Sequence, residues 1–167
     1  PGPLDENGDP LQNGCEYWDQ VFYITKQEVL AHYYNGFDSG VFAADYVCDE
    51  IPESILYWPG AGNPFLDNIS LANPADFWDH DEDGIYNPCV GDMPTVVIKG
   101  CEYENLINTI TNMPDQIAFS VRNDAVRSNP LTDSDPMRIE LHTYAFNYIN
   151  SKIESTIYWK YDIINKG

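Results

Sequence analysis

An acidic loop carries the residues of this chain whose types and spacing best fit a chemical role. Asp79, Asp81 and Asp83 stand at alternate positions, and Gly84 follows them directly. A tight loop around a hard cation needs oxygen ligands at alternate positions and a sharp turn after the third carboxylate. The pattern therefore predicts a calcium site, in which the backbone carbonyl of Ile85 would supply the next ligand.

The second half of this loop departs from the EF-hand pattern. Its twelfth position holds Val90 instead of a glutamate, and Pro88 prevents an outgoing helix. The closing carboxylate must therefore come from elsewhere, and Asp92 is the nearest candidate. We expect the ion to be structural and not catalytic. The alternative is an acidic surface turn that holds no ion.

The four cysteines form an even set, which permits disulfides and implies an oxidising compartment. The simplest pairing is sequential, Cys15 with Cys48 and Cys89 with Cys101. The second bond would join the outgoing side of the acidic loop to the turn at Gly100. Neither a CxxC motif nor a Cys/His cluster is present, so zinc is not expected. The alternative is four buried free thiols.

Net charge excludes several kinds of partner. The 167 residues carry a formal charge of −19, with 27 acidic residues against 8 lysines and arginines. Such a chain cannot neutralise a phosphate backbone, so nucleic-acid binding is not expected. The charge also disfavours an anionic membrane surface, and no run is apolar enough to span a bilayer. It favours a protein that holds cations or stays soluble in salt.

No catalytic motif stands out, because a nucleophile elbow, a zinc helix and a dinucleotide fingerprint are all missing. Each histidine has a plainer explanation. We expect His32 to face water on a helix, His80 to point outward between two proposed ligands, and His142 to lie on the polar face of a sheet. A glycosidase carboxylate pair cannot be recognised among so many acids. The chain is therefore not expected to be an enzyme.

The acidic loop must be held by a mainly β framework. Alternating apolar residues predict strands at 117–122, 137–146 and 157–164, the last two joined by a turn at 150–152 into an antiparallel hairpin. In the last strand, Ile157, Trp159, Tyr161 and Ile163 form the apolar set, so they are expected in the core. Shorter strands are expected at 16–24, 51–58 and 95–98, and residues 102–115 form either a short helix or a long loop.

One helix is expected near the start. Thr25 is a suitable N-cap, and Glu28 three residues later completes a capping box. Val29, Leu30 and Tyr33 would form its apolar stripe.

These elements predict a single mainly β domain over residues 15–167, an antiparallel β-sandwich with one short N-terminal helix and long loops. Residues 1–14, rich in glycine and proline, are expected to form an arm or linker. The chain begins without methionine and stops at Gly167 after a strand pattern, so it is expected to be part of a longer chain. The open edge of its last strand would allow another chain to add a strand.

Several short motifs follow one another in a recognisable order. They are Cys15-Glu16-Tyr17-Trp18-Asp19, Pro52 with Ile55-Leu56-Tyr57-Trp58-Pro59, Asp81 to Pro88, Gly91-Asp92-x-Pro94, Gly100, Arg122-Asn123-Asp124, Tyr144-Ala145-Phe146-Asn147 and Tyr161-x-Ile163-Ile164-Asn165-Lys166. Together they resemble the N-terminal region of large exported proteins of the Bacteroidota that carry a type IX secretion C-terminal sorting domain. The segment from Cys101 to Pro114 departs from that pattern as an insertion. The resemblance implies a secreted or cell-surface multidomain protein, and so a location more than an activity.

Two functions fit these observations. The first is a non-catalytic extracellular surface or structural module (an adhesion, filament or sheath component) stabilised by calcium and disulfides. The alternative is a carbohydrate-binding module, or an accessory domain of a secreted hydrolase, in which Trp18, Trp58, Trp78 or Trp159 stacks on sugars. Aromatic residues at strand spacing are more often part of a core, however. The expected partners are accordingly other surface proteins or glycans.

Overall fold

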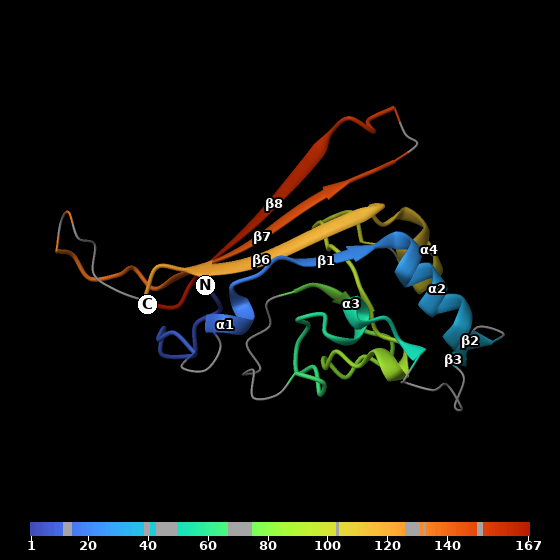
Figure 1. Cartoon of the computed structure of the whole chain (residues 1–167), viewed down its shortest axis with the longest axis horizontal. Helices are drawn as coiled ribbons and strands as arrows, with labels where there is room; N and C mark the ends of the chain where they lie inside the picture. Colours follow the sequence, from blue (N-terminus) through green and yellow to red (C-terminus); the bar gives the residue numbers. More distant parts are fainter. Residues whose placement is uncertain are drawn as a thin grey trace.

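Four antiparallel strands form the sheet around which the protein is built (Figure 1). They are β1 (Phe22–Thr25), β6 (Gln116–Asn123), β7 (Ile139–Asn147) and β8 (Ile157–Asn165), which lie in the order β1-β6-β7-β8. The computed structural model describes residues 1–11, 15–38, 41–42, 50–66, 75–102, 104–125, 131, 133–149 and 152–167. The predicted mainly β, antiparallel fold is confirmed, as is the hairpin that β7 and β8 form.

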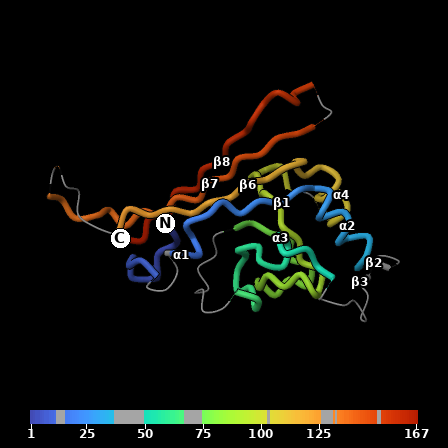
Figure 2. The backbone as a smooth tube through the Cα atoms, viewed as in Figure 1, coloured from blue at the N-terminus to red at the C-terminus, as the bar shows by residue number. Residues whose placement is uncertain are grey.

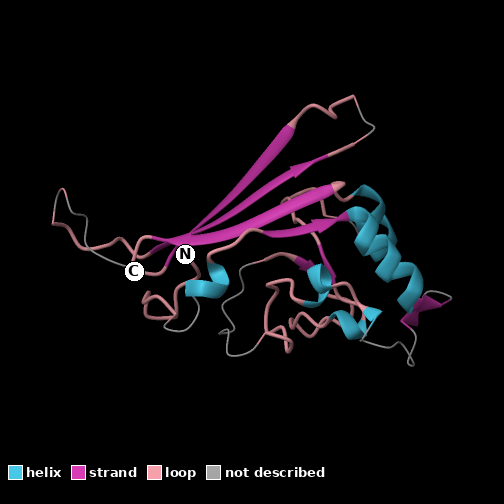
Figure 3. Cartoon of the chain, in the orientation of Figure 1, coloured by secondary structure: helices cyan, strands magenta, loops and turns pink. Residues whose placement is uncertain are grey.

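A second layer of short elements covers one side of this sheet, in a sandwich-like arrangement (Figure 3). Its helices are α1 (Cys15–Trp18), α2 (Lys26–Gly36), α3 (Glu53–Leu56), the 3-10 helix η2 (Pro88–Val90) and α4 (Leu106–Asn112). Two small sheets complete it, β2 (Phe37–Asp38) with β3 (Val41–Phe42) and β4 (Phe77–Trp78) with β5 (Met93–Pro94).

The core lies between the sheet and this second layer. On β6 the alternating residues Ile117, Phe119 and Val121 are buried, as the sequence predicted. They pack against Trp58 and Tyr86 of the covering layer, and the whole set forms one continuous apolar cluster. A single face of the sheet therefore supplies the core.

The predicted capping box of α2 is confirmed. The backbone N–H of Glu28 donates to Thr25 Oγ1 at 3.2 Å, and the backbone N–H of Thr25 donates to Glu28 Oε2 at 2.9 Å. These two bonds satisfy donors that the first helical turn leaves without partners. His32 does not face water as predicted: its side chain is 1% exposed and lies 3.1 Å from the Pro88 carbonyl oxygen.

Three predicted short strands are wrong in whole or in part. Residues 16–24 contain α1 before β1 begins, and residues 51–58 contain α3. Pro52 precedes the first turn of α3, a position where its missing N–H costs no helical bond. Residues 95–98 form no strand, although Thr95 and Val97 donate hydrogen bonds to Asp76. The undecided segment 102–115 contains α4, capped by Asn105.

The described part of the predicted N-terminal arm packs on the domain. Leu4 is fully buried, and its backbone N–H donates to Glu140 Oε2 at 2.6 Å. Gly2 donates a backbone hydrogen bond to Val121 of β6. Figure 2 shows the two ends of the chain near each other at one end of the sheet. Residues 1–11 therefore belong to the folded unit.

The buried and exposed faces of the β7–β8 hairpin are the reverse of those predicted from the sequence. Glu140 and His142 of β7 are buried, whereas Trp159 and Tyr161 of β8 are 58% and 56% exposed. Glu140 Oε1 lies 2.6 Å from His142 Nε2, so each polar group has a buried partner. Burial raises the pKa of Glu140, but the hydrogen bonds from His142 and Leu4 outweigh it and hold the pKa below its ordinary value.

The burial of His32 predicts that stability depends on pH. Burial lowers its pKa from 6.5 to about 4, although the hydrogen bond to Pro88 opposes the shift. Between these values the unfolded chain binds more protons, so the free energy of unfolding falls as the pH is lowered through this range. The loss amounts to about 3 kcal/mol by pH 4.

We expect His32→Gln, which keeps a donor for Pro88, to remove this component. Urea unfolding of both proteins between neutral pH and pH 4 measures it, and the other titrating groups cancel in the difference. The wild type should lose about 3 kcal/mol more than the variant. Parallel pH profiles of the two proteins would contradict the assignment.

Candidate metal centre

The small sheet of β4 and β5 brings the two ends of the acidic loop together. Phe77 pairs with Pro94 and Trp78 with Met93 in antiparallel register. Asp79 directly follows β4 and Asp92 directly precedes β5, so both lie at the same end of this ladder. The loop is therefore closed by backbone pairing, which the predicted calcium pattern did not include.

Three carboxylates converge in this loop. One carboxylate oxygen from each of Asp79, Asp81 and Asp92 lies within 4.8 Å of the others. Asp92 is fully buried, Asp79 is half-buried and Asp81 is exposed. The group is thus open to solvent on one side and closed on the other, with oxygen as its only side-chain ligand atom.

Hydrogen bonds inside the loop fix the orientation of these carboxylates. Asp79 Oδ2 accepts the backbone N–H of Gly84 at 2.8 Å, which folds the loop back on its first residue. Asp92 accepts the backbone N–H groups of His80 and Asn87, each at 2.7 Å. Gly84 has a φ of 77°, in the left-handed region that favours glycine.

The electrostatics of the group favour a bound cation. The pKa of Asp92 is raised to about 6, mainly by burial; the hydrogen bonds from His80 and Asn87 oppose the rise, and the charges of Asp79 and Asp81 add to it. Asp79 Oδ1 is buried and has no hydrogen-bond partner. An unsatisfied buried carboxylate oxygen is unfavourable. A divalent cation at this point would supply the missing partner and offset the repulsion.

The five predicted ligands divide between this group and the tip of the loop. Asp79, Asp81 and Asp92 are brought together, including the closing carboxylate that the EF-hand pattern lacks. Asp83 is not part of the group: its Oδ1 accepts the backbone N–H of Ile85 at 2.7 Å on the exposed turn. A ligand role for the Ile85 carbonyl stays a prediction.

The sequence analysis missed the residue that anchors the loop. Tyr86 is fully buried, and its hydroxyl donates to the Ile55 carbonyl at 2.6 Å. A Cβ atom at Gly60 would lie 2.6 Å from Tyr86 Cβ, so only glycine allows this close approach. The sequence signal was present, as an aromatic residue beside the acidic run and a glycine-rich turn before it.

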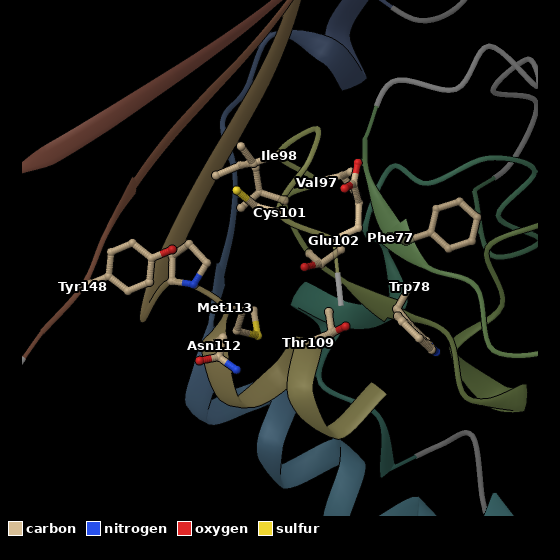
Figure 4. Close-up of a pocket in the computed structure, with 13 residues that line it drawn as sticks. Phe77, Trp78, Val97, Ile98, Cys101, Glu102, Thr109, Asn112, Met113 and Tyr148 are labelled. Atoms are coloured by element: carbon tan, nitrogen blue, oxygen red, sulfur yellow. The ribbon is translucent and has the colours of Figure 1, made fainter. Parts of the chain in front are cut away.

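The predicted disulfide between Cys89 and Cys101 is wrong. Cys89 is disulfide-bonded, whereas Cys101 is an exposed free thiol. The chain between them passes through β5, and Cys101 reaches the rim of a hollow that Met113 and Tyr148 also line (Figure 4). Cys89 stays in η2, whose Pro88 carbonyl contacts His32 of α2. The predicted bond between Cys15 and Cys48 falls on side chains outside the described residues.

The hollow in Figure 4 is mostly apolar, with a volume of about 140 Å³. It lies between the segment after β5 and the end of α4, and its apolar lining includes Val97, Ile98 and Met113. Glu102 is the only carboxylate among the described residues that line it. Among the described lining residues this hollow therefore has no pair of carboxylates.

A second polar cluster joins β8 to the covering layer. Lys160 Nζ lies 2.7 Å from a carboxylate oxygen of Asp76 and 2.7 Å from one of Asp162. The same ammonium group sits 4.5 Å from the centre of the Tyr144 ring, and the Tyr144 hydroxyl accepts the backbone N–H of Asp76. Lys160 joins β8 to Asp76 of the covering layer and to Tyr144 of β7, and Tyr144 in turn binds Asp76, so the cluster has a structural explanation.

Comparison with known proteins identifies no relative. No protein family matches the sequence, and neither a curated protein nor a solved structure is similar to it. Within the described part of the chain, no helix has the length and apolar character needed to cross a bilayer.

The assignment of the cysteines can be checked by labelling. Iodoacetamide added to the native, non-reduced protein should modify the peptide that contains Cys101 and leave the peptide with Cys89 unmodified, because only an accessible thiol reacts. Peptide mass spectrometry measures both. Cys101→Ser should change the free energy of unfolding by less than about 0.5 kcal/mol. Modification of Cys89 without reductant would contradict the assignment.

Proposed function

We propose that this chain is a non-catalytic extracellular surface or structural module whose acidic loop holds a structural calcium ion. The convergence of Asp79, Asp81 and Asp92 within 4.8 Å is the observation that carries the proposal. The buried oxygen of Asp79 that lacks a partner supports it independently. In such a module the ion contributes to folding, because crowded carboxylates repel one another until a cation offsets their charge.

The ligand chemistry favours calcium over other metals. All three side-chain ligands are carboxylates, and hard cations such as Ca²⁺ and Mg²⁺ prefer oxygen. Zinc and copper sites usually include nitrogen or sulfur ligands. A loop that offers irregularly placed oxygens suits the flexible coordination of calcium better than the strict octahedron of magnesium. Water and the Ile85 carbonyl would complete the coordination.

An extracellular location agrees with two further features. Cys89 takes part in a disulfide, and such bonds persist mainly in oxidising compartments. The order of motifs resembles exported Bacteroidota proteins with a type IX sorting domain, which implies secretion or display at the outer surface. A structural calcium ion is also consistent with that environment.

The edge of the sheet supports a role in assembly. β8 is the last strand of the four-stranded sheet and pairs only with β7 among the described strands. Its other edge has backbone N–H and C=O groups that a strand from a neighbouring chain could bind. An adhesion, filament or sheath component would join its neighbours in this way.

The burial of the tryptophan side chains limits which of them could stack on a sugar in the alternative function, carbohydrate binding. Trp18 and Trp58 are 2% and 1% exposed, so neither can stack on a sugar. Trp78 is half-buried. Trp159 alone among the four tryptophans has a largely exposed side chain.

Thermal unfolding in calcium tests the proposed ion. The non-reduced protein is heated in excess Ca²⁺ and in excess chelator at one ionic strength near neutral pH. At a Ca²⁺ concentration one hundred times Kd, binding adds about 2.7 kcal/mol to the free energy of unfolding. For a chain of this size the unfolding temperature should rise by roughly 5 to 10 °C.

The variants separate binding from general charge effects. Asp81→Asn removes one ligand with little change in shape, and Asp81 is exposed, so the apo-protein should fold normally. It should abolish most of the calcium shift. Glu154→Gln removes the same charge from an exposed turn far from the loop in sequence and should retain the full shift. A shift that both variants retain, or no shift in the wild type, would overturn the proposed ion.

A further inference from the structure

We infer that the outer face of the four-stranded sheet binds a neutral polysaccharide chain across an aromatic trough. This face is the one turned away from the core, and it was expected from the sequence to be buried. The inference concerns the opposite side of the sheet from the covering layer, and it does not depend on the calcium proposal.

The trough is a row of four side chains, one from each strand. Strand pairing places Tyr23 opposite Ala118, Ala118 opposite Ala145, and Ala145 opposite Trp159. Two alanines thus form the floor between two exposed aromatic residues. Since neighbouring strands lie about 4.8 Å apart, the row spans roughly 14 Å. That length accommodates a short run of linked sugar rings.

The structure has a surface hollow at the two alanines of this row. A hollow of about 160 Å³ opens on the sheet beside the two alanines, and its lining includes Tyr23, Ile157 and Asn147. Along β8, the rings of Trp159 and Tyr161 are parallel to within 6°, with their centres 6.1 Å apart. The sheet backbone fixes the positions of both residues and their rings stack on each other, which reduces the ordering that binding would require.

The neighbouring rows offer hydrogen-bonding groups without charge. Ser120, Thr143 and Tyr161 form the next row, and Gln116 and Asn147 lie on the other side of the trough. Hydroxyl and amide groups between aromatic rings match the alternation of C–H faces and hydroxyl edges on a pyranose ring. Sites for small polar ligands combine apolar surface with a few oriented polar groups in the same way.

The charge distribution favours a neutral ligand over a second copy of the chain. The outer-facing residues of the four strands include no aspartate or glutamate, and Arg122 is their only charged member. The acidic residues within these strands, Glu140 and Asp162, belong to the opposite face. With Arg122 as its only charge, this face offers little that could pair with the acidic surface of another chain of net charge −19, whereas a neutral glycan needs no such pairing.

Isothermal titration with neutral oligosaccharides tests the site. The probes are cellohexaose, xylohexaose, mannohexaose and chitohexaose, titrated into the wild-type protein in calcium. We expect at least one to bind, and Trp159→Ala and Tyr161→Ala each to weaken that binding about tenfold or more. Because Trp159 is the exposed tryptophan, the bound sugar should also protect the fluorescence from acrylamide quenching.

Tyr34→Ala is the matched control, since Tyr34 is an exposed aromatic residue on α2, outside the sheet. It should leave binding unchanged. Circular dichroism establishes that each variant is folded. The folded Asp81→Asn variant should still bind the sugar, and this result would show that the sugar site is distinct from the calcium loop. Three outcomes would overturn the inference: no probe binds, binding survives both aromatic substitutions, or Trp159→Ala abolishes self-association of a protein that binds no sugar.

Discussion

The packing of Phe119 is the interaction on which most of the structure depends. Its ring is fully buried in β6 and contacts the rings of Phe22, Trp58 and Tyr144, with centres 4.7 to 6.3 Å apart. These rings come from β1, the covering layer and β7, so one side chain joins all three. Trp58 also donates to the Asp76 carbonyl, and the Tyr144 hydroxyl accepts the Asp76 backbone N–H. The start of β4, and with it the acidic loop, is therefore positioned by the aromatic core.

Local signals predicted the elements that local interactions form. The capping box at Thr25 and the alternation along β7 and β8 depend on neighbours a few residues away, and both were predicted correctly. Alternation defines two faces of a strand but does not determine which face is covered. That choice depends on Glu140, whose carboxylate is satisfied by the backbone of Leu4, 136 positions earlier in the chain. A contact of this range leaves no local pattern in the sequence.

In the candidate metal centre, too, the residues could be predicted from the local sequence, but their burial could not. Spacing identified Asp79 and Asp81, and the absence of a glutamate at the twelfth position pointed to Asp92. The burial of Asp92 was not predictable, because it results from the pairing of β4 with β5. The prediction of a Cys89–Cys101 disulfide failed for the same reason. The two cysteines are twelve positions apart in sequence, but the distance between them depends on the path of the chain through β5.

The sheet separates two environments that differ in charge. On the covered side, Glu140, Asp162 and Asp76 are all paired with a cation or a histidine. The outward-facing strand residues include no acid, so the excess acid of the chain lies elsewhere on its surface and in the acidic loop. Since β7 and β8 pair along their whole length, that ladder sets the positions of Trp159 and Tyr161 on the outer face. The face that presents these two rings is therefore held by backbone pairing within the sheet.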